Sequence, residues 1–201
     1  METMNKRRVL LVVLALIIVL IFSISGKAVA SPEFPVFHVT ETFCTAGEGG
    51  QTWFAGNTHH GRNVAYTSVV VADNPAGIYD AFDTVNWNIN LNTMEGVAWG
   101  TYEQTLPDSS DGWQGTWNSE MYTSNVTIES GFPLWLNEGK GVGHGTGSFF
   151  GMQVKFVFEQ FVYVFEEEPS GYPCVTGQTI EGDYFVLEQQ VTGYIIGMPE
   201  D

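Results

Sequence analysis

Proton transfer is the chemistry that the ionisable side chains of this sequence would most directly support. General acid–base catalysis needs such a group inside a pocket, where burial shifts its pKa toward neutrality. His144 stands between Gly143 and Gly145, where its ring would border bare backbone at the mouth of a cavity. Glu103 lies within a predicted strand and would serve the same purpose if it faced inward. Either residue could equally lie on the solvent-facing side, because burying an unpaired charge is costly.

Metal chemistry is not indicated by the histidine pattern. His59 and His60 are adjacent, and neighbouring side chains on a strand point to opposite faces, so the pair cannot hold one ion without a turn. Gly56 and Gly61 flank the pair and favour a loop. We therefore expect neither a metal site nor a cofactor.

The elements that would position the candidate groups are strands. Apolar and polar residues alternate in Val85-Asn-Trp-Asn-Ile-Asn-Leu91, which predicts a strand with one face in the core and one in water. The cluster Pro107-Asp-Ser-Ser-Asp-Gly112 predicts a turn, so residues 95–105 and 113–122 should pair as a hairpin. Beyond residue 30, no long segment has a convincing helical period.

Glycine-threonine steps flanked by aromatic residues recur between Gly96 and Gly151. Glycine inside a strand marks a bend or the close approach of another backbone, and aromatic side chains on the same strands would fill the enclosed space. The pattern predicts a curved and closed antiparallel sheet. With Glu103 and His144, the candidate ligand-binding residues are Trp87, Trp99, Trp113, Trp117 and Phe149.

The fold class that follows is all-β, and we expect a single antiparallel barrel of about eight strands over residues 31–201. A β-sandwich is the second choice. The strand from Val154 to Phe165 is apolar on both faces. A bulge near Glu159–Gln160, a second layer or a subunit partner would each explain this.

The two cysteines, Cys44 and Cys174, lie near opposite ends of the predicted barrel. In an oxidising compartment they would form a disulfide, and closing so long a loop would stabilise the fold by about 5 kcal/mol. The bond would place the segment after the first strand beside the connection before the last one, as a barrel that closes on itself requires. Two unpaired buried thiols are the alternative.

A signal for export occupies residues 1–30. Lys6-Arg-Arg8 precedes an apolar run over residues 9–22 and then Ala28-Val-Ala30, a pattern typical of a cleaved signal peptide. The run is shorter than the roughly 20 residues of a spanning helix, and an uncleaved anchor is the competing interpretation. We expect a secreted or extracytoplasmic protein that meets the membrane only through this segment before cleavage. In a host that glycosylates, Asn125 begins a sequon.

Acidic residues dominate the charge of the chain. The 23 acidic and seven basic residues give a formal net charge of −16 at pH 7. Beyond residue 30 three cations remain against 22 carboxylates, a net charge of −19. This excess argues against nucleic acids and anionic membrane surfaces as partners. Cationic ligands remain allowed, although solubility alone would also explain an acidic surface.

Three motifs resemble the core of the allene oxide cyclase and dirigent-like barrels. They are Trp99-Gly-Thr-Tyr102, Trp113-Gln-Gly-Thr-Trp117 and Gly141-Val-Gly-His-Gly-Thr-Gly-Ser-Phe-Phe-Gly-Met152, within residues 95–155. In those barrels a similar glycine-rich stretch enters a late strand. The resemblance implies an eight-stranded, calycin-like barrel with an apolar cavity, often assembled as a homotrimer. It carries no catalytic set onto positions of this chain.

Three functions are compatible with these observations. The barrel could bind a small apolar ligand in its interior, or an inward polar group could make the same pocket an isomerase or cyclase. Alternatively, exposed aromatic residues could stack on sugars, as in a carbohydrate-binding module. An enclosed void would favour the first two functions, whereas a flat exposed row of Trp53, Trp135 or Tyr122 would favour the third.

Overall fold

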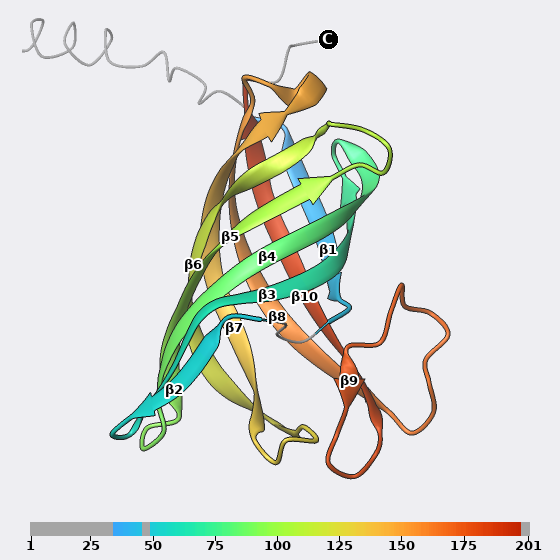
Figure 1. Ribbon diagram of the computed structural model, residues 1–201. Coiled ribbons are helices and arrows are strands. Elements are labelled where there is room, and N and C mark those ends of the chain that lie inside the picture. The colour runs from blue at the N-terminus through green and yellow to red at the C-terminus, as the bar shows by residue number, and fades with distance from the viewer. Residues whose placement is uncertain (1–33, 46–48, 198–201) are drawn as a thin grey trace, which may run out of the picture. The chain divides into compact units, whose positions relative to one another are not determined.

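The computed structural model describes residues 34–45 and 49–197, and the predicted signal segment 1–30 lies outside the described residues. In the described part there is no α-helix, and hence none of a length and apolarity that would cross a membrane. The all-β prediction is confirmed. The strands are β1 (Val36–Phe43), β2 (Gln51–Ala55), β3 (Thr58–Asp73), β4 (Ala76–Asn90), β5 (Glu95–Thr105), β6 (Gly112–Thr127), β7 (Pro133–Thr146), β8 (Gln153–Phe165), β9 (Gly177–Gln178) and β10 (Tyr184–Ile196), with the 3-10 turn η1 (Gly147–Phe149) between β7 and β8 (Figure 1).

These strands form an antiparallel sheet that closes on itself (Figure 1). From β3 to β8 each strand pairs with the next, β10 follows β8, and β1 pairs with both β10 and β3. Eight strands therefore make the barrel wall, while the short β2 and β9 add to β3 and β10. The predicted barrel is confirmed in preference to a sandwich, and its architecture is consistent with a calycin-like fold.

β3 is long enough to pair with two strands along one edge. Its residues 58–62 pair with β2, and its residues 68–72 pair with β1. On its other edge the register with β4 shifts between Gly61 and Val64, and Asn63 between them has a φ of 55°. This left-handed backbone is typical of a bulge. The bulge therefore lies between the part of β3 that pairs with β2 and the part that pairs with β1.

The predicted hairpin of residues 95–105 and 113–122 is confirmed. β5 pairs with β6 along its whole length, from Glu95 opposite Tyr122 to Thr105 opposite Gly112. The residues between the two strands form the turn that the sequence predicts. β5 and β6 are also the strands that bring Tyr102, Trp113 and Trp117 to the interior.

Large aromatic rings of the interior lie over glycines on the neighbouring strand. Gly100 on β5 is opposite Trp117 on β6, and a Cβ atom at Gly100 would lie 2.2 Å from the Thr84 carbonyl oxygen and 2.8 Å from the Trp117 ring. Gly61 is opposite Trp87, whose ring would lie 2.3 Å from a Cβ atom there. The aromatic residues thus need bare backbone beside them, which is the physical basis of the glycine-aromatic pattern.

The glycine-rich stretch over residues 143–151 ends β7 and leads into β8. β7 continues to Thr146, and η1 then turns the chain toward β8, which starts at Gln153. Gly147 has a φ of 60°, a conformation that favours glycine. In this turn the Phe149 ring stacks on Trp113 with the ring centroids 5.2 Å apart.

The two apolar faces of β8 do not arise from a bulge. β8 and β10 pair in continuous register from Gln153 to Phe165, so the bulge predicted near Glu159–Gln160 is absent. On the outer face, Tyr163 and Phe165 contact Tyr172 in the segment that follows β8, with ring centroids 6.2 and 5.5 Å apart. The chain itself therefore covers part of this face.

The predicted disulfide between Cys44 and Cys174 is confirmed, and the two Cα atoms lie 5.3 Å apart. Cys44 directly follows β1, and Cys174 precedes β9 and β10. Because β1 pairs with β10, the bond joins segments beside the first and last strands of the barrel, as predicted. Such a bond indicates an oxidising environment.

Candidate functional site

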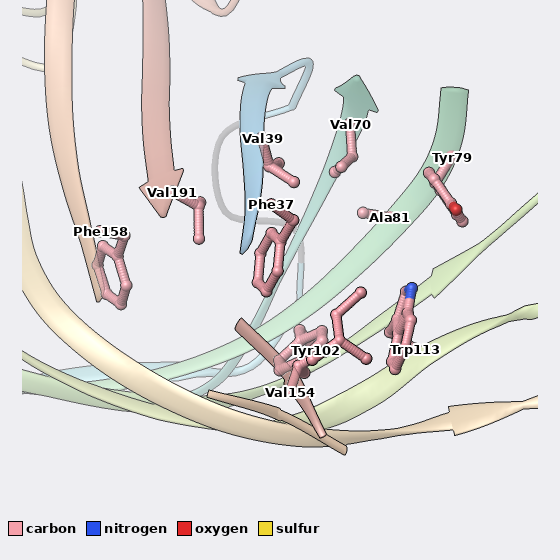
Figure 2. Close-up of a cluster of buried hydrophobic side chains, with 11 residues drawn as sticks. Phe37, Val39, Val70, Tyr79, Ala81, Tyr102, Trp113, Val154, Phe158 and Val191 are labelled. Atoms are coloured by element: carbon pink, nitrogen blue, oxygen red, sulfur yellow. The ribbon is translucent and has the colours of Figure 1, made fainter. Parts of the chain in front are cut away.

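The interior of the barrel contains two cavities, of about 190 and about 50 Å³. Both are lined mainly by side chains that alternate inward along the strands, as the pleat of a sheet requires. The larger cavity is lined by residues that include Val85, Trp87, Ile89, Met121 and Leu187. The smaller is lined by Phe37, Tyr102, Trp113, Val154 and Val191 among others, and Figure 2 shows these five side chains inside the barrel.

Four side chains separate the two cavities. Asp83, Trp117, Phe158 and Gln189 line both of them. The Trp117 and Phe158 rings meet edge to face, with centroids 5.8 Å apart. The boundary is therefore half aromatic and half polar, and its polar half holds a carboxyl group.

A second buried carboxyl group, that of Glu41 on β1, lies at the same level. Glu41 is only 3% exposed. The Ser68 hydroxyl donates to Glu41 Oε1 at 2.5 Å, and the Gln189 amide donates to Glu41 Oε2 at 3.0 Å. Both carboxylate oxygens therefore have a partner within the protein.

Hydrogen bonds continue from Gln189 across three more strands. Gln160 Nε2 donates to Gln189 Oε1 at 3.3 Å, and the Asn137 side-chain amide donates to Gln160 Oε1 at 2.9 Å. Ser119 Oγ donates to Asn137 Oδ1 at 2.9 Å. We call this chain the polar belt; it links β6, β7, β8, β10, β1 and β3 through Ser119, Asn137, Gln160, Gln189, Glu41 and Ser68.

Asp83 on β4 lies beside Glu41 and is 7% exposed. Burial raises the pKa of the Asp83 carboxyl well above its usual range, and the neighbouring Glu41 raises it further, whereas the Trp117 indole acts in the opposite direction. Burial also raises the pKa of Glu41, against hydrogen bonding from Ser68. Two such carboxyls favour a state in which they hold one proton between them. Asp83 Oδ2 is buried without a hydrogen-bond partner.

The basic side chains of the described residues lie away from this pair. Arg62 lies on the outer face, with its guanidinium 5.4 Å from the centre of the Trp53 ring and 4.9 Å from that of Trp99. Lys140 and Lys155 are exposed. None of the three lines either interior cavity. Within residues 34–45 and 49–197, no lysine or arginine therefore lies where it could offset a negative charge on the pair.

The larger cavity reaches the end of the barrel where the β2–β3 and β4–β5 turns lie, the lower end in Figure 1. There it adjoins a surface depression of about 350 Å³. We call the residues around this depression the mouth. Those shared with the larger cavity are His59, Ile128, Pro133 and Trp135, and those that complete the depression include Leu91, Met94 and Phe132.

The two adjacent histidines belong to β3, so the predicted loop is wrong. They point to opposite sides of the sheet, as strand neighbours do. His60 stacks on Trp53 with centroids 5.1 Å apart and hydrogen-bonds to Asn88, whereas His59 lines the mouth. Burial lowers the pKa of His59, as does the neighbouring His60. His59 is therefore neutral at pH 7.

The structure divides the predicted ligand-binding set between the two sides of the wall. Those on the inner side are Trp87, Trp113 and Trp117, with Phe149 packed against the interior cluster, and those exposed on the outer side are Trp99, Glu103 and His144. His144 hydrogen-bonds to the exposed Gln114 at 2.9 Å.

Sequence reasoning missed the two carboxyls that do face inward, Glu41 and Asp83. The signal for Asp83 was present, because the alternation that begins at Val85 continues two residues toward the N-terminus and places Asp83 on the same face. Glu41 likewise shares the parity of Phe37 and Val39 on β1.

The aromatic residues considered for a sugar-binding platform do not form a row. Trp53 is exposed on β2, Trp135 lines the mouth and the larger cavity, and Tyr122 is half-buried on β6. The three residues therefore do not make the flat exposed row that a carbohydrate-binding module would present.

Comparison with protein-family models, with curated proteins and with solved structures finds no match to this chain. What is shown of the resemblance to allene oxide cyclase and dirigent-like proteins is therefore the barrel architecture.

Proposed function

We propose that this protein binds a small, largely apolar molecule inside its barrel. The observation that carries the proposal is the cavity of about 190 Å³, enclosed by Val85, Trp87, Ile89 and Met121 and adjoining the mouth. Pockets for small molecules are typically concave and mainly apolar, with a few polar groups that fix orientation. This cavity has that character.

The size of the cavity limits its occupant to about one ring. An apolar cavity of roughly 150 Å³ accommodates benzene, so the interior suits a single aromatic ring or a short aliphatic chain. A longer molecule would extend through the mouth, where His59 and Trp135 would contact it. Burial of the ring would remove apolar surface from water on both sides, which is the main source of affinity.

Two unpaired polar atoms support a bound molecule with a polar group. Trp87 Nε1 is a buried donor without a partner, and Asp83 Oδ2 is a buried acceptor without one. Both residues line the larger cavity. A buried polar group without a partner costs about 1–3 kcal/mol, so a molecule that satisfies one of them would gain part of that free energy.

A second candidate function is proton-transfer catalysis of the isomerase type in the same cavity. The observation that favours it is the Glu41–Asp83 pair, since a carboxyl whose pKa is raised can both donate and accept a proton near neutral pH. Turnover would then consume the bound molecule, whereas simple binding would leave it unchanged.

The place of action that we propose is outside the cytoplasm. The Cys44–Cys174 disulfide supports this place because such bonds persist in oxidising compartments. The proposal that residues 1–30 direct export rests on the sequence pattern.

Calorimetric titration of the exported chain with ethylbenzene tests interior binding. Met121 lines the larger cavity, so Met121→Trp should fill it and weaken binding by about tenfold or more, the equivalent of 1.4 kcal/mol. The matched control is Val157→Trp on the outer face, where Val157 is 60% exposed. That variant should bind as the wild type does. No heat of binding at saturating ethylbenzene, or equal binding by a folded Met121→Trp variant, would contradict the proposal.

A further inference from the structure

We propose that the molecule bound in the barrel is an amine, whose ammonium group lies at Asp83 between the two cavities and whose apolar part occupies the larger one. This inference rests on the proposed interior binding and names the chemical class of the ligand. It follows from the polar atoms at the boundary, the charge of the interior and the aromatic lining.

The first step identifies the carboxyl oxygen that can still form a hydrogen bond with a ligand. Both oxygens of Glu41 accept hydrogen bonds from Ser68 and Gln189, so its bonding capacity toward a ligand is largely used. Asp83 Oδ2 has no partner, and Asp83 lines both cavities. A ligand in the larger cavity therefore meets one unpartnered oxygen of Asp83, in a carboxyl pair that shares one proton and carries one negative charge. The group complementary to that pair is a donor.

The second step is the charge of that donor. No lysine or arginine of the described residues lines either cavity, and the one histidine that does, His59, is neutral at pH 7 because burial lowers its pKa. A buried carboxylate without a counter-ion is costly, and a cation beside it relieves that cost. An ammonium group therefore gains more at Asp83 than a neutral hydroxyl does. A carboxylate ligand would add a third negative group.

The third step is the lining that would surround the ammonium group. The ring of Trp117 borders both cavities at the level of Asp83, and Trp87 and Tyr66 line the larger cavity. Indole and phenol rings attract cations through their π-systems. These residues also supply the apolar surface for the carbon part of the ligand. The negative net charge of the chain also favours a cationic ligand, because a strongly acidic protein concentrates cations around itself.

The titratable group that acts on the pKa of Asp83 is Glu41 from β1, and the two carboxyls act in turn on Tyr102 from β5. The pKa of Tyr102 is raised, chiefly by burial and also by the two carboxyls, so its hydroxyl stays neutral. The residues of β3, β6 and β10 at this level, Ser68, Trp117 and Gln189, do not titrate. Affinity for an ammonium ion should therefore fall as the pH is lowered and the carboxyl pair takes up its second proton.

The test compares three ligands of nearly the same shape on the exported chain by calorimetry at pH 7.5. They are 2-phenylethylamine, ethylbenzene and 3-phenylpropionate, of which the first is a cation, the second neutral and the third an anion. The amine should bind about tenfold or more tightly than ethylbenzene, the equivalent of about 1.4 kcal/mol, because it adds a charge-assisted hydrogen bond. The anion should bind most weakly.

The variant Asp83→Asn should remove the advantage of the amine and keep ethylbenzene binding. Its matched control is Glu103→Gln, which neutralises an exposed carboxylate on the outer face and should leave the advantage unchanged. If Asp83→Asn fails to fold, the ranking of the three ligands on the wild type and its loss at low pH decide the matter.

The outcomes separate the two proposals. Equal binding of the amine and ethylbenzene, or tightest binding of the anion, would overturn the amine inference while interior binding stands. If none of the three ligands binds, both proposals fail. If the amine keeps its advantage in a folded Asp83→Asn variant, the assignment of the ammonium group to Asp83 is wrong.

Discussion

The carboxyl group of Glu41 lies beside that of Asp83, across the intervening strand β3, in the interior of the barrel. Neither residue has a lysine or arginine partner among the described residues, and both are more than nine-tenths buried. Placing two acids together away from water costs stability, and proteins that keep such pairs commonly use them at functional sites. This relationship underlies the proton-transfer candidate, the amine inference and the first prediction below.

The stability of the barrel should fall as the pH rises above the acidic range. The pKa of Asp83 in the folded state lies well above its usual range, chiefly because of burial, so the folded state retains a proton that the unfolded chain loses. The contribution of Asp83 to stability is therefore greatest below about pH 4 and is lost as the pH rises through the raised pKa. Glu41 contributes with the same sign because its pKa is also raised.

Asp83→Asn removes this titration and should stabilise the protein at pH 8 by on the order of 1 kcal/mol. The dependence of the melting temperature on pH should become shallower between pH 5 and 8. Thermal unfolding followed by circular dichroism measures both effects. Glu103→Gln on the exposed face should change neither the stability at pH 8 nor the pH dependence of the melting temperature. A lower melting temperature for Asp83→Asn at pH 8 would contradict the statement that this buried carboxyl pair costs stability.

Reduction of the Cys44–Cys174 bond should lower the melting temperature by several degrees. The bond closes a loop with a sequence separation of 130, and the chain-entropy model gives about 5 kcal/mol for a loop of this length. Thermal unfolding with and without reductant measures the difference. The double variant Cys44→Ala/Cys174→Ala should melt near the reduced protein and be insensitive to reductant. An unchanged melt on full reduction would show that barrel closure does not depend on the bond.

Gly100→Ala should destabilise the barrel by about 1–3 kcal/mol, the usual cost of overpacking. The added Cβ atom would lie 2.2 Å from the Thr84 carbonyl oxygen, so the wall or the Trp117 ring must shift. Gly171→Ala is the matched control, because a Cβ atom at Gly171 meets nothing within 4 Å. Urea unfolding of both variants tests the prediction. Equal stability of the two would mean that Trp117 does not require bare backbone beside it.

The sequence predicts most of the wall, because period-two alternation and turn residues are local signals. The register of β5 and β6 and the disulfide could be inferred from Pro107–Gly112 and from two cysteines after export. The reason why both faces of β8 are apolar could not be inferred from the sequence. On the outer face Tyr163 contacts Tyr172, which belongs to a loop without any repeating pattern. Local patterns describe a strand but not what packs on it.

The candidate site was less predictable than the wall. Glu103 and His144 were chosen as single residues within suggestive motifs, and both lie outside. Glu41 and Asp83 acquire their chemistry from each other, and they meet only because β1 closes against β3. Parity along β1 and β4 shows which way each side chain points. Their proximity depends on strand order, which a single sequence does not encode locally.

The polar belt has a consequence for which molecules can enter. It runs around the inner wall through side chains of six neighbouring strands, from Ser119 to Ser68, and its member Gln189 lines both cavities. A rigid molecule that extended past this level would have to displace the side chains that line both cavities, and moving Gln189 would break its hydrogen bonds to Glu41 and Gln160, at about 1 kcal/mol for each. Passage from the larger cavity to the smaller one is thereby restricted. The protein should therefore discriminate among ligands by how far they extend inward from the mouth.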